Sequence, residues 1–172
     1  MNKSLLPKVI LISGTPGVGK TTISDLLRKQ GYQVLSLNEF ILANGLFFGL
    51  DLSRDSVIVD EEILQSKLLE EIKCFSDLLF IEGHNAELVP SNSIDSAFVL
   101  RCNSGILRER LESSRDYSKN KIEENINAEI MDECLLAIKY HHSSTKVFEI
   151  DTTTLTPHAI VNKILNYITE KI

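Results

Sequence analysis

The sequence predicts an α/β fold of three layers, in which a five-stranded parallel sheet is covered by helices on both faces. Short apolar segments rich in β-branched residues alternate with amphipathic segments of helical spacing, the pattern of parallel strands joined by crossover helices. The 172 residues are 43% hydrophobic, which is enough to build a buried core. No repeat or Pro/Gly-rich linker divides them, so we expect one domain over residues 1–172.

The first strand is expected at residues 8–13, because this apolar segment is short and ends at Gly14. A helix follows from about Gly19 and stops near Gly31, a residue that favours helix C-termini. The remaining strands are expected at 33–37, 78–81, 97–101 and 147–150. The remaining helices are expected at 38–43, from Asp60, at 104–112, at 119–140 and from Thr156-Pro157.

Two of these helices have clear apolar faces. We expect the helix after Asp60 to bury Ile63, Leu64, Leu68 and Ile72. The helix at 119–140 is expected to bury Ile122, Ile126, Ile130, Cys134 and Ile138. The histidines at its end, His141 and His142, are expected to cap the helix rather than to bind a metal.

Composition excludes several functional classes. The formal net charge of −6 argues against broad nucleic-acid binding, which depends on basic patches. No apolar run approaches the roughly 20 residues of a membrane span, so no membrane association is expected. Three cysteines, Cys74, Cys102 and Cys134, are an odd number without metal-site spacing. We therefore expect free thiols and a cytoplasmic protein.

A phosphate-binding loop lies between the first strand and the first helix. Residues 14–21 read GTPGVGKT, which satisfies G-x-x-x-x-G-K-[ST] in the strand–helix context that this motif requires. Gly14, Gly17 and Gly19 let backbone N–H groups converge on an anion. Lys20 is expected to reach the β- and γ-phosphates, Thr21 to ligate Mg²⁺ and Thr22 to contact the α-phosphate. The sequence therefore predicts binding of ATP with Mg²⁺.

Residues beyond the loop favour a kinase over a guanine-specific GTPase. The nearest match to an N-K-x-D base reader is residues 120–123, which end in Glu and open an amphipathic helix. Arg108, Arg110 and Arg115 instead suit a lid that neutralises charge on the transferring phosphoryl group. Surface ion pairs with Glu109 and Glu112 are the alternative for these arginines.

An acidic residue and a histidine follow the third strand. Glu82 ends an apolar strand beside the phosphate loop, where a Walker-B acid organises Mg²⁺. His84 is placed to position an attacking water or to accept its proton, which would add ATPase activity. A loop histidine with a backbone partner is the alternative.

These motifs resemble those of the atypical adenylate kinases of the isoenzyme-six type, the family of the coilin-interacting nuclear ATPases and their archaeal counterparts. The resemblance is carried by residues 14–22, 51–61, 82–84, 108–112 and 115–117, and by Asn125-Ile126 with Glu129. It implies a P-loop NTPase fold with a short monophosphate-binding segment at 33–56 and a short lid at 112–119. It also implies ATP-phosphate contacts from Gly17, Gly19, Lys20, Thr21 and Thr22, with Glu82 as Walker-B acid, His84 as motif histidine and Arg115 as lid arginine.

The resemblance further implies a nucleoside monophosphate kinase that prefers AMP and has ATPase activity. It implies a role in late maturation of the small ribosomal subunit and in rRNA processing, through transient binding of a basic small-subunit ribosomal protein and without sequence-specific contact to nucleic acid. A nuclear location is implied in a eukaryote. We expect in-line phosphoryl transfer, with Lys20, Arg110 and Arg115 stabilising charge.

The acceptor side leaves alternatives open. Leu42 stands where family members commonly carry an arginine, so Arg54 is a substitute for it, or the chain is chiefly an ATPase. A kinase of another small acceptor and an ATP-gated assembly factor are the rival functions. The apolar run at residues 46–50 either stacks an acceptor base or belongs to the core. Residues 151–154 either contact adenine or form an ordinary Asp/Thr turn.

Overall fold

A computed structural model describes residues 6–51, 56–114 and 117–169 of the chain. Five strands form one parallel sheet in the order β2-β5-β1-β6-β7, which confirms the predicted sheet. Their bounds are β1 (Lys8–Ser13), β2 (Gln33–Ser36), β5 (Leu78–Glu82), β6 (Ile94–Arg101) and β7 (Lys146–Asp151). The central strand, β1, lies between β5 and β6, so the loop that follows it is flanked by the ends of both neighbours.

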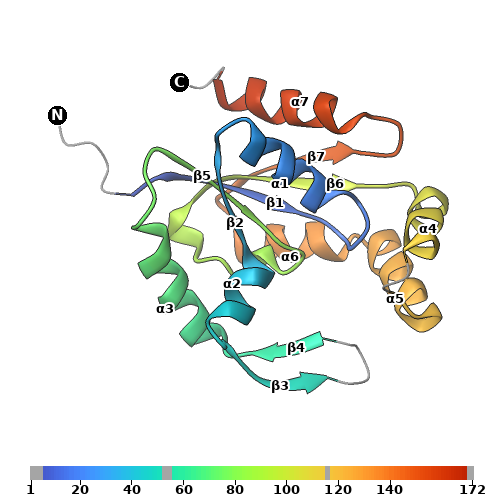
Figure 1. Cartoon of the computed structure of the whole chain (residues 1–172), viewed down its shortest axis with the longest axis horizontal. Coiled ribbons are helices and arrows are strands. Elements are labelled where there is room, and N and C mark those ends of the chain that lie inside the picture. Colours follow the sequence, from blue (N-terminus) through green and yellow to red (C-terminus); the bar gives the residue numbers. More distant parts are fainter. Residues whose placement is uncertain (1–5, 52–55, 115–116, 170–172) are drawn as a thin grey trace.

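Helices cover both faces of the sheet (Figure 1). One face carries α1 (Lys20–Lys29), α4 (Ser104–Ser113), α5 (Lys119–Ile130) and α7 (Pro157–Thr169). The other carries α2 (Leu37–Ala43), α3 (Glu61–Ile72) and α6 (Glu133–His141). Side chains of β1 alternate between the two cores: Ile10 and Ile12 enter the first, Val9 and Leu11 the second. This confirms the three-layer α/β fold.

Local capping signals in the sequence have the expected structural roles. Asp60 accepts a hydrogen bond from the backbone N–H of Ile63 at 3.1 Å and begins α3. Thr156 accepts one from Ala159 N–H at 3.3 Å at the start of α7. Gly31, with φ of 89°, follows α1 in the left-handed region.

The predicted helix at 119–140 is wrong as one continuous element. It divides into α5 and α6 at Asp132, which has a left-handed φ of 58° and forms an ion pair with Arg101. An aspartate tolerates this conformation better than most residues, and the ion pair holds it there. The break redirects the chain, so Ile130 is 63% exposed instead of buried. Ile63 is also exposed, whereas its expected companions Leu64, Leu68 and Ile72 are buried.

A hairpin that the sequence analysis did not predict lies outside the main sheet. It consists of β3 (Phe47–Asp51) and β4 (Ser56–Val59), paired antiparallel (Figure 1). The core interpretation of residues 46–50 holds for Leu46, which is buried, but is wrong for Phe48, which is 71% exposed. Among the described residues these two strands pair only with each other, and a two-stranded hairpin by itself is only marginally stable.

Among the described residues, none of the helices combines the length and the apolar composition needed to cross a bilayer. The short 3₁₀ turns η1 (Ala86–Leu88) and η2 (Ser91–Ser93) connect β5 to β6.

Candidate functional site

The candidate site lies at the carboxyl edge of the sheet, where β1 and β5 end side by side. Ile12 of β1 is in register with Glu82 of β5, and Gly83 N–H donates to the carbonyl of Ile12 at 3.1 Å. This pairing brings the segment Glu82-Gly83-His84 directly beside the loop that begins at Gly14. Ligands of open parallel sheets bind at this edge, so the register alone assembles the two halves of the site.

Glycines shape the loop into a cradle. Gly14, Gly17 and Gly19 have φ angles of 140°, 90° and 108°, a region that side-chain-bearing residues rarely adopt. A Cβ on Gly14 would collide with the carbonyl oxygen of Leu100, and a Cβ on Gly17 would lie 2.8 Å from Leu111 Cδ2. The loop therefore packs against β6 and α4 at a distance that excludes side chains, and its backbone N–H groups are accessible to an anion.

Lys20 is held inside this cradle. Its Nζ donates to the carbonyls of Gly14 at 2.6 Å and Thr15 at 3.1 Å. Burial lowers the pKa of Lys20, while the nearby Cys134, Glu82 and Glu129 act in the opposite direction. The ammonium group is fixed at the loop before any ligand binds, as expected for a residue that neutralises phosphate charge.

Glu82 and Thr21 are suitable ligands for Mg²⁺. The Glu82 side chain is 8% exposed, and its carboxylate takes part in no hydrogen bond or ion pair with the described residues. Thr21 is exposed in the first turn of α1. No group of three or more His, Cys, Asp or Glu in the described residues suits a metal ion. Mg²⁺ is commonly bound by one or two protein oxygens together with waters and substrate phosphates. The Glu82 carboxylate and the Thr21 hydroxyl would supply such oxygens.

His84 is a neutral imidazole at pH 7. Burial, reinforced by the positive charges of Lys20 and Lys121, lowers its pKa to about 4. Its backbone carbonyl accepts a hydrogen bond from the Cys134 thiol at 3.7 Å, so α6 packs against this turn. A base this weak suits orientation of a water better than full removal of its proton.

The three lid arginines differ in their contacts. Arg108 lies 4.0 Å from its expected i,i+4 partner Glu112 and also pairs with both carboxylate oxygens of Glu123 on α5, the second at 2.8 Å. The surface ion-pair alternative therefore describes Arg108. Arg110 donates to the Thr152 carbonyl at 2.9 Å, and Thr152 Oγ1 in turn donates to the Val18 carbonyl of the loop at 3.0 Å. Thr152 thus connects Arg110 to the phosphate loop by hydrogen bonds. The proposed lid arginine, Arg115, lies outside the described residues.

Glu129 on α5 joins the phosphate loop to the end of β6. Its Oε2 accepts from Thr15 Oγ1 at 2.5 Å, and its Oε1 accepts from Arg101 Nε at 2.9 Å and from Cys102 N–H at 3.0 Å. Arg101 also pairs with Glu149 at 3.0 Å. Glu129 belongs to the family pattern, but the sequence assigned no role to it. Only its helical register with Asn125 and Lys121 indicated that it shares a face with them.

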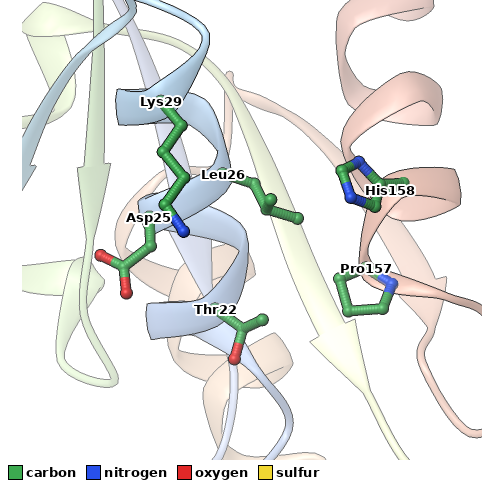
Figure 2. A pocket seen from close by; sticks show the side chains of 6 residues that line it. All are labelled: Thr22, Asp25, Leu26, Lys29, Pro157 and His158. Carbon is green, nitrogen blue, oxygen red and sulfur yellow. The ribbon is translucent and has the colours of Figure 1, made fainter.

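Thr22 lines a hollow of about 270 Å³ between α1 and α7. Figure 2 shows Thr22 and Leu26 on α1 facing Pro157 and His158 at the start of α7. At the turn of residues 151–154, Asp151 Oδ1 accepts a hydrogen bond from Thr153 N–H at 2.8 Å. Residues 151–154 therefore form an ordinary Asp/Thr turn, one of the two interpretations of this segment. The other interpretation, contact with adenine, stays a prediction.

The expected caps at the end of α6 have different environments. His142 is the C-cap residue, is buried, and its Nδ1 lies 2.8 Å from Ser91 Oγ, whereas His141 is exposed. Burial lowers the pKa of His142. His141 and His142 therefore anchor the end of α6 to Ser91 of η2. Neither histidine belongs to a metal-binding cluster among the described residues.

Comparison with known proteins places this geometry in context. Residues 10–132 match the family model described as an AAA domain. A protein of Methanocaldococcus jannaschii named "Putative adenylate kinase" is 41% identical over 163 residues, which cover 94% of this chain and 86% of that protein. Proteins of the same name from Methanococcus maripaludis and Pyrococcus abyssi are 36% and 40% identical and cover 93% of this chain in each case, and 88% and 83% of their own lengths.

Solved structures share the fold at low identity. A shikimate kinase from Bacteroides thetaiotaomicron superposes with a TM-score of 0.59 at 15% identity, covering 94% of this chain and 98% of that one. A gluconokinase from Sinorhizobium meliloti gives 0.56 at 13% identity, covering 96% and 93%. At these identities the likeness concerns the fold alone.

Proposed function

Because the chain belongs to the atypical adenylate kinase family of the P-loop kinases, we propose that it transfers the γ-phosphoryl group of ATP to a nucleoside monophosphate, with AMP preferred. The observation that carries the proposal is the arrangement around Lys20. Its ammonium group is fixed by the carbonyls of Gly14 and Thr15, and the carboxylate of Glu82, which pairs with no other described residue, lies within electrostatic reach of it. A cation and a metal-binding acid are thus organised at one glycine-rich loop.

The chain's own residues divide the work of transfer. Backbone N–H groups of residues 14–21 and the N-terminus of α1 cradle the phosphates, and Lys20 neutralises charge on the β- and γ-phosphates. Thr21 and Glu82 would hold Mg²⁺, which would supply positive charge to offset the negative charge of the phosphates. Arg110 approaches from α4, and Arg115 in the lid at 112–119 is proposed to complete the charge stabilisation. Transfer is in line, from ATP to the acceptor.

The acceptor is proposed to bind at the segment 33–56. This segment contains α2 and the hairpin, with Leu42 58% exposed and Phe48 71% exposed. An exposed aromatic ring on a strand offers a stacking surface for a nucleobase. Leu42 cannot hold a phosphate, so Arg54, outside the described residues, is proposed to do so.

A panel of acceptors tests the kinase proposal. ADP formation from ATP is measured with AMP, CMP, UMP, GMP, shikimate, gluconate and no acceptor. We expect AMP to give the largest stimulation over the rate without acceptor. If no monophosphate raises the rate above that of water, the chain is not a nucleoside monophosphate kinase; stimulation by a sugar-like acid instead would make it a kinase of another acceptor.

We also propose ATPase activity, supported by the position of neutral His84 beside Lys20. The imidazole is proposed to orient the attacking water. The variant His84→Asn should lower ATP hydrolysis without acceptor by about 10- to 100-fold, while the dissociation constant of ATP stays within twofold. Collapse of ATP binding would instead make His84 a structural residue of the site.

A second candidate function is that of an ATP-gated factor in small ribosomal subunit maturation, acting in the cytoplasm or, in a eukaryote, the nucleus. Four large apolar side chains are exposed at the α5–α6 turn and on α6: Ile130, Met131, Leu136 and Tyr140. Apolar exposure of this kind, on a chain of net charge −6, suits a basic protein partner better than bare RNA.

Binding of purified small-subunit ribosomal proteins, with and without ATP, tests this candidate. We expect one basic ribosomal protein to be retained in a nucleotide-dependent manner, and Leu136→Asp to abolish its retention. Failure to retain any of them in both conditions would remove this role and leave the kinase proposal intact.

A further inference from the structure

One face of α5 carries polar residues toward the candidate site. Lys121, Asn125 and Glu129 are spaced four residues apart, so they lie one above another along the helix. Glu129 is the last of the three and Lys121 the first. A polar row beside the buried Ile122 and Ile126 is unusual unless its members have partners.

The two ends of this row are located by their interactions. Glu129 accepts the hydrogen bond of Thr15 at the phosphate loop. Lys121 lies close enough to His84 for its charge to contribute to the low pKa of that imidazole. Asn125 is one helical turn from each. Its side chain therefore lies on the same face of α5 as theirs, between the residue that contacts the phosphate loop and the residue near His84.

Asn125 is a buried donor without an acceptor. Its side chain is 5% exposed, and its Nδ2 has no hydrogen-bond partner within residues 6–51, 56–114 and 117–169. Leaving an amide N–H₂ unsatisfied in this way costs stability, so such groups in a folded protein call for an explanation. Glu129, one turn away, has both of its oxygens occupied.

We propose that Asn125 is a phosphate-binding residue whose side-chain amide donates to an oxygen of the ATP γ-phosphoryl group, with the Lys121 ammonium adding positive charge on the same side. The inference rests on the proposed ATP binding and adds to it a second wall of the site, opposite the glycine-rich loop. A phosphate oxygen is a strong acceptor, and its hydrogen bond to a buried amide is charge-assisted. The α5 helix would then sense whether the bound nucleotide carries a third phosphate.

An isosteric apolar substitution separates this role from a structural one. In Asn125→Leu the shape is nearly kept and the unsatisfied donor is removed, so the nucleotide-free protein should melt at the same temperature or a higher one. Asn127 is on the same helix with an exposed side chain, so Asn127→Leu is the matched control. Asn125→Ala is a second variant in case the branched leucine is not accommodated.

The test is the dissociation constant of ATP and of ADP for each variant, measured by calorimetry with Mg²⁺ and no acceptor. We expect Asn125→Leu and Asn125→Ala to weaken ATP binding by about 10-fold or more and to change ADP binding less than twofold. Asn127→Leu should change neither. Lys121→Gln should weaken ATP binding in the same selective way.

Equal loss of ATP and ADP affinity, or no loss of either, would overturn the assignment. So would an unchanged ATP affinity with a raised KM for AMP, which would place the amide at the acceptor. The kinase proposal is tested independently, by the acceptor panel. If the wild-type protein phosphorylates no monophosphate but Asn125→Leu selectively weakens ATP binding, the inference holds without it, and if the wild type binds no ATP, both are wrong.

Discussion

The phosphate loop and the β3–β4 hairpin are built in opposite ways. The loop is held by buried polar contacts from three elements: Lys20 on α1, Glu129 on α5 and Thr152 after β7. The hairpin pairs only with itself and exposes Phe48 and Ile58. One region is held by these hydrogen bonds and has Gly14 and Gly17 packed against neighbours, whereas the other presents apolar side chains to solvent.

The two regions therefore differ in how much they must rearrange when a ligand binds: the loop is preorganised, and the hairpin, proposed as part of the acceptor side, can move. Pre-formed electrostatics at the loop avoid reorganisation when phosphate charge develops, which is where such preorganisation lowers the barrier most. The hairpin, proposed as part of the acceptor segment, exposes apolar side chains with which it can close over a bound acceptor and exclude water from the transfer. Substitutions at the loop should therefore affect chemistry or stability strongly, and substitutions on the hairpin should affect acceptor binding alone.

The largest effect is expected from Lys20→Met. Removal of the ammonium group should lower the rate of phosphoryl transfer by about 10²–10³-fold, because its charge acts on the transferring group in a water-poor site. ADP formation in steady state is the measurement. Lys29→Met, on an exposed position of the same helix, is the control and should retain the wild-type rate. A Lys20→Met enzyme with near wild-type activity would show that the cradle is not the catalytic site.

A large loss of stability is expected from Glu129→Ala. The change leaves Arg101, a fifth exposed, without one of its carboxylate partners, and Thr15 without its acceptor, so the free energy of unfolding should fall by about 3 kcal/mol. Urea denaturation measures it. Glu124→Ala, exposed on the same helix, should change stability by less than about 0.5 kcal/mol. Equal effects of the two variants would mean that α5 does not hold the loop.

His84 should make stability depend on pH. Its pKa in the folded protein, about 4, lies below the ordinary value of 6.5, so the unfolded chain binds more protons in that interval. Stability should fall as pH decreases from about 6.5 to about 4, by at most about 3.5 kcal/mol, since one pKa unit corresponds to about 1.4 kcal/mol.

The difference between wild type and His84→Asn isolates this contribution. Burial raises the pKa of Glu87, which makes stability change in the opposite sense, and this contribution is common to both proteins. Urea titrations at several pH values between 4 and 7 give the comparison. His158→Asn, in the hollow beside α1, is the control. If the free energy of unfolding depended on pH in the same way for wild type and His84→Asn, His84 would not be a buried neutral imidazole.

The smallest effect on stability is expected from Phe48→Ala. The ring is 71% exposed, so its removal should change the free energy of unfolding by less than about 0.5 kcal/mol. Loss of base stacking should nevertheless raise the KM for AMP about 5- to 10-fold at an unchanged affinity for ATP. Tyr140→Ala, an exposed aromatic on α6, serves as control for non-specific effects. An unchanged KM for AMP would separate the hairpin from the acceptor site.

Much of the molecule was predictable because its signals are local. Each strand of the main sheet is a short apolar run, and glycine at positions 14, 17 and 19 is needed wherever the backbone takes positive φ. Asp60 and Thr156 cap the helices that they precede. The strand–loop–helix context of residues 14–21 then identifies a phosphate site, since its chemistry depends mainly on backbone conformation and one lysine.

The errors of prediction occurred where distant residues override local pattern. The helical periodicity of 119–140 continues through Asp132, and only the ion pair with Arg101 accompanies the break there. The apolar run at 46–50 has the composition of a core strand, yet it lies on a hairpin outside the main sheet, where little packs against it.

The sheet, the phosphate loop and its lysine follow from the sequence, because propensity, capping and motif spacing act over a few residues. Only the folded chain shows that Glu129 accepts a hydrogen bond from Thr15, 114 residues earlier, that the half-buried Arg110 donates to Thr152, and that Asn125 Nδ2 is buried with no hydrogen-bond partner among the described residues. These contacts depend on how helices cross the edge of the sheet. Packing fixes that crossing, and no local pattern encodes it.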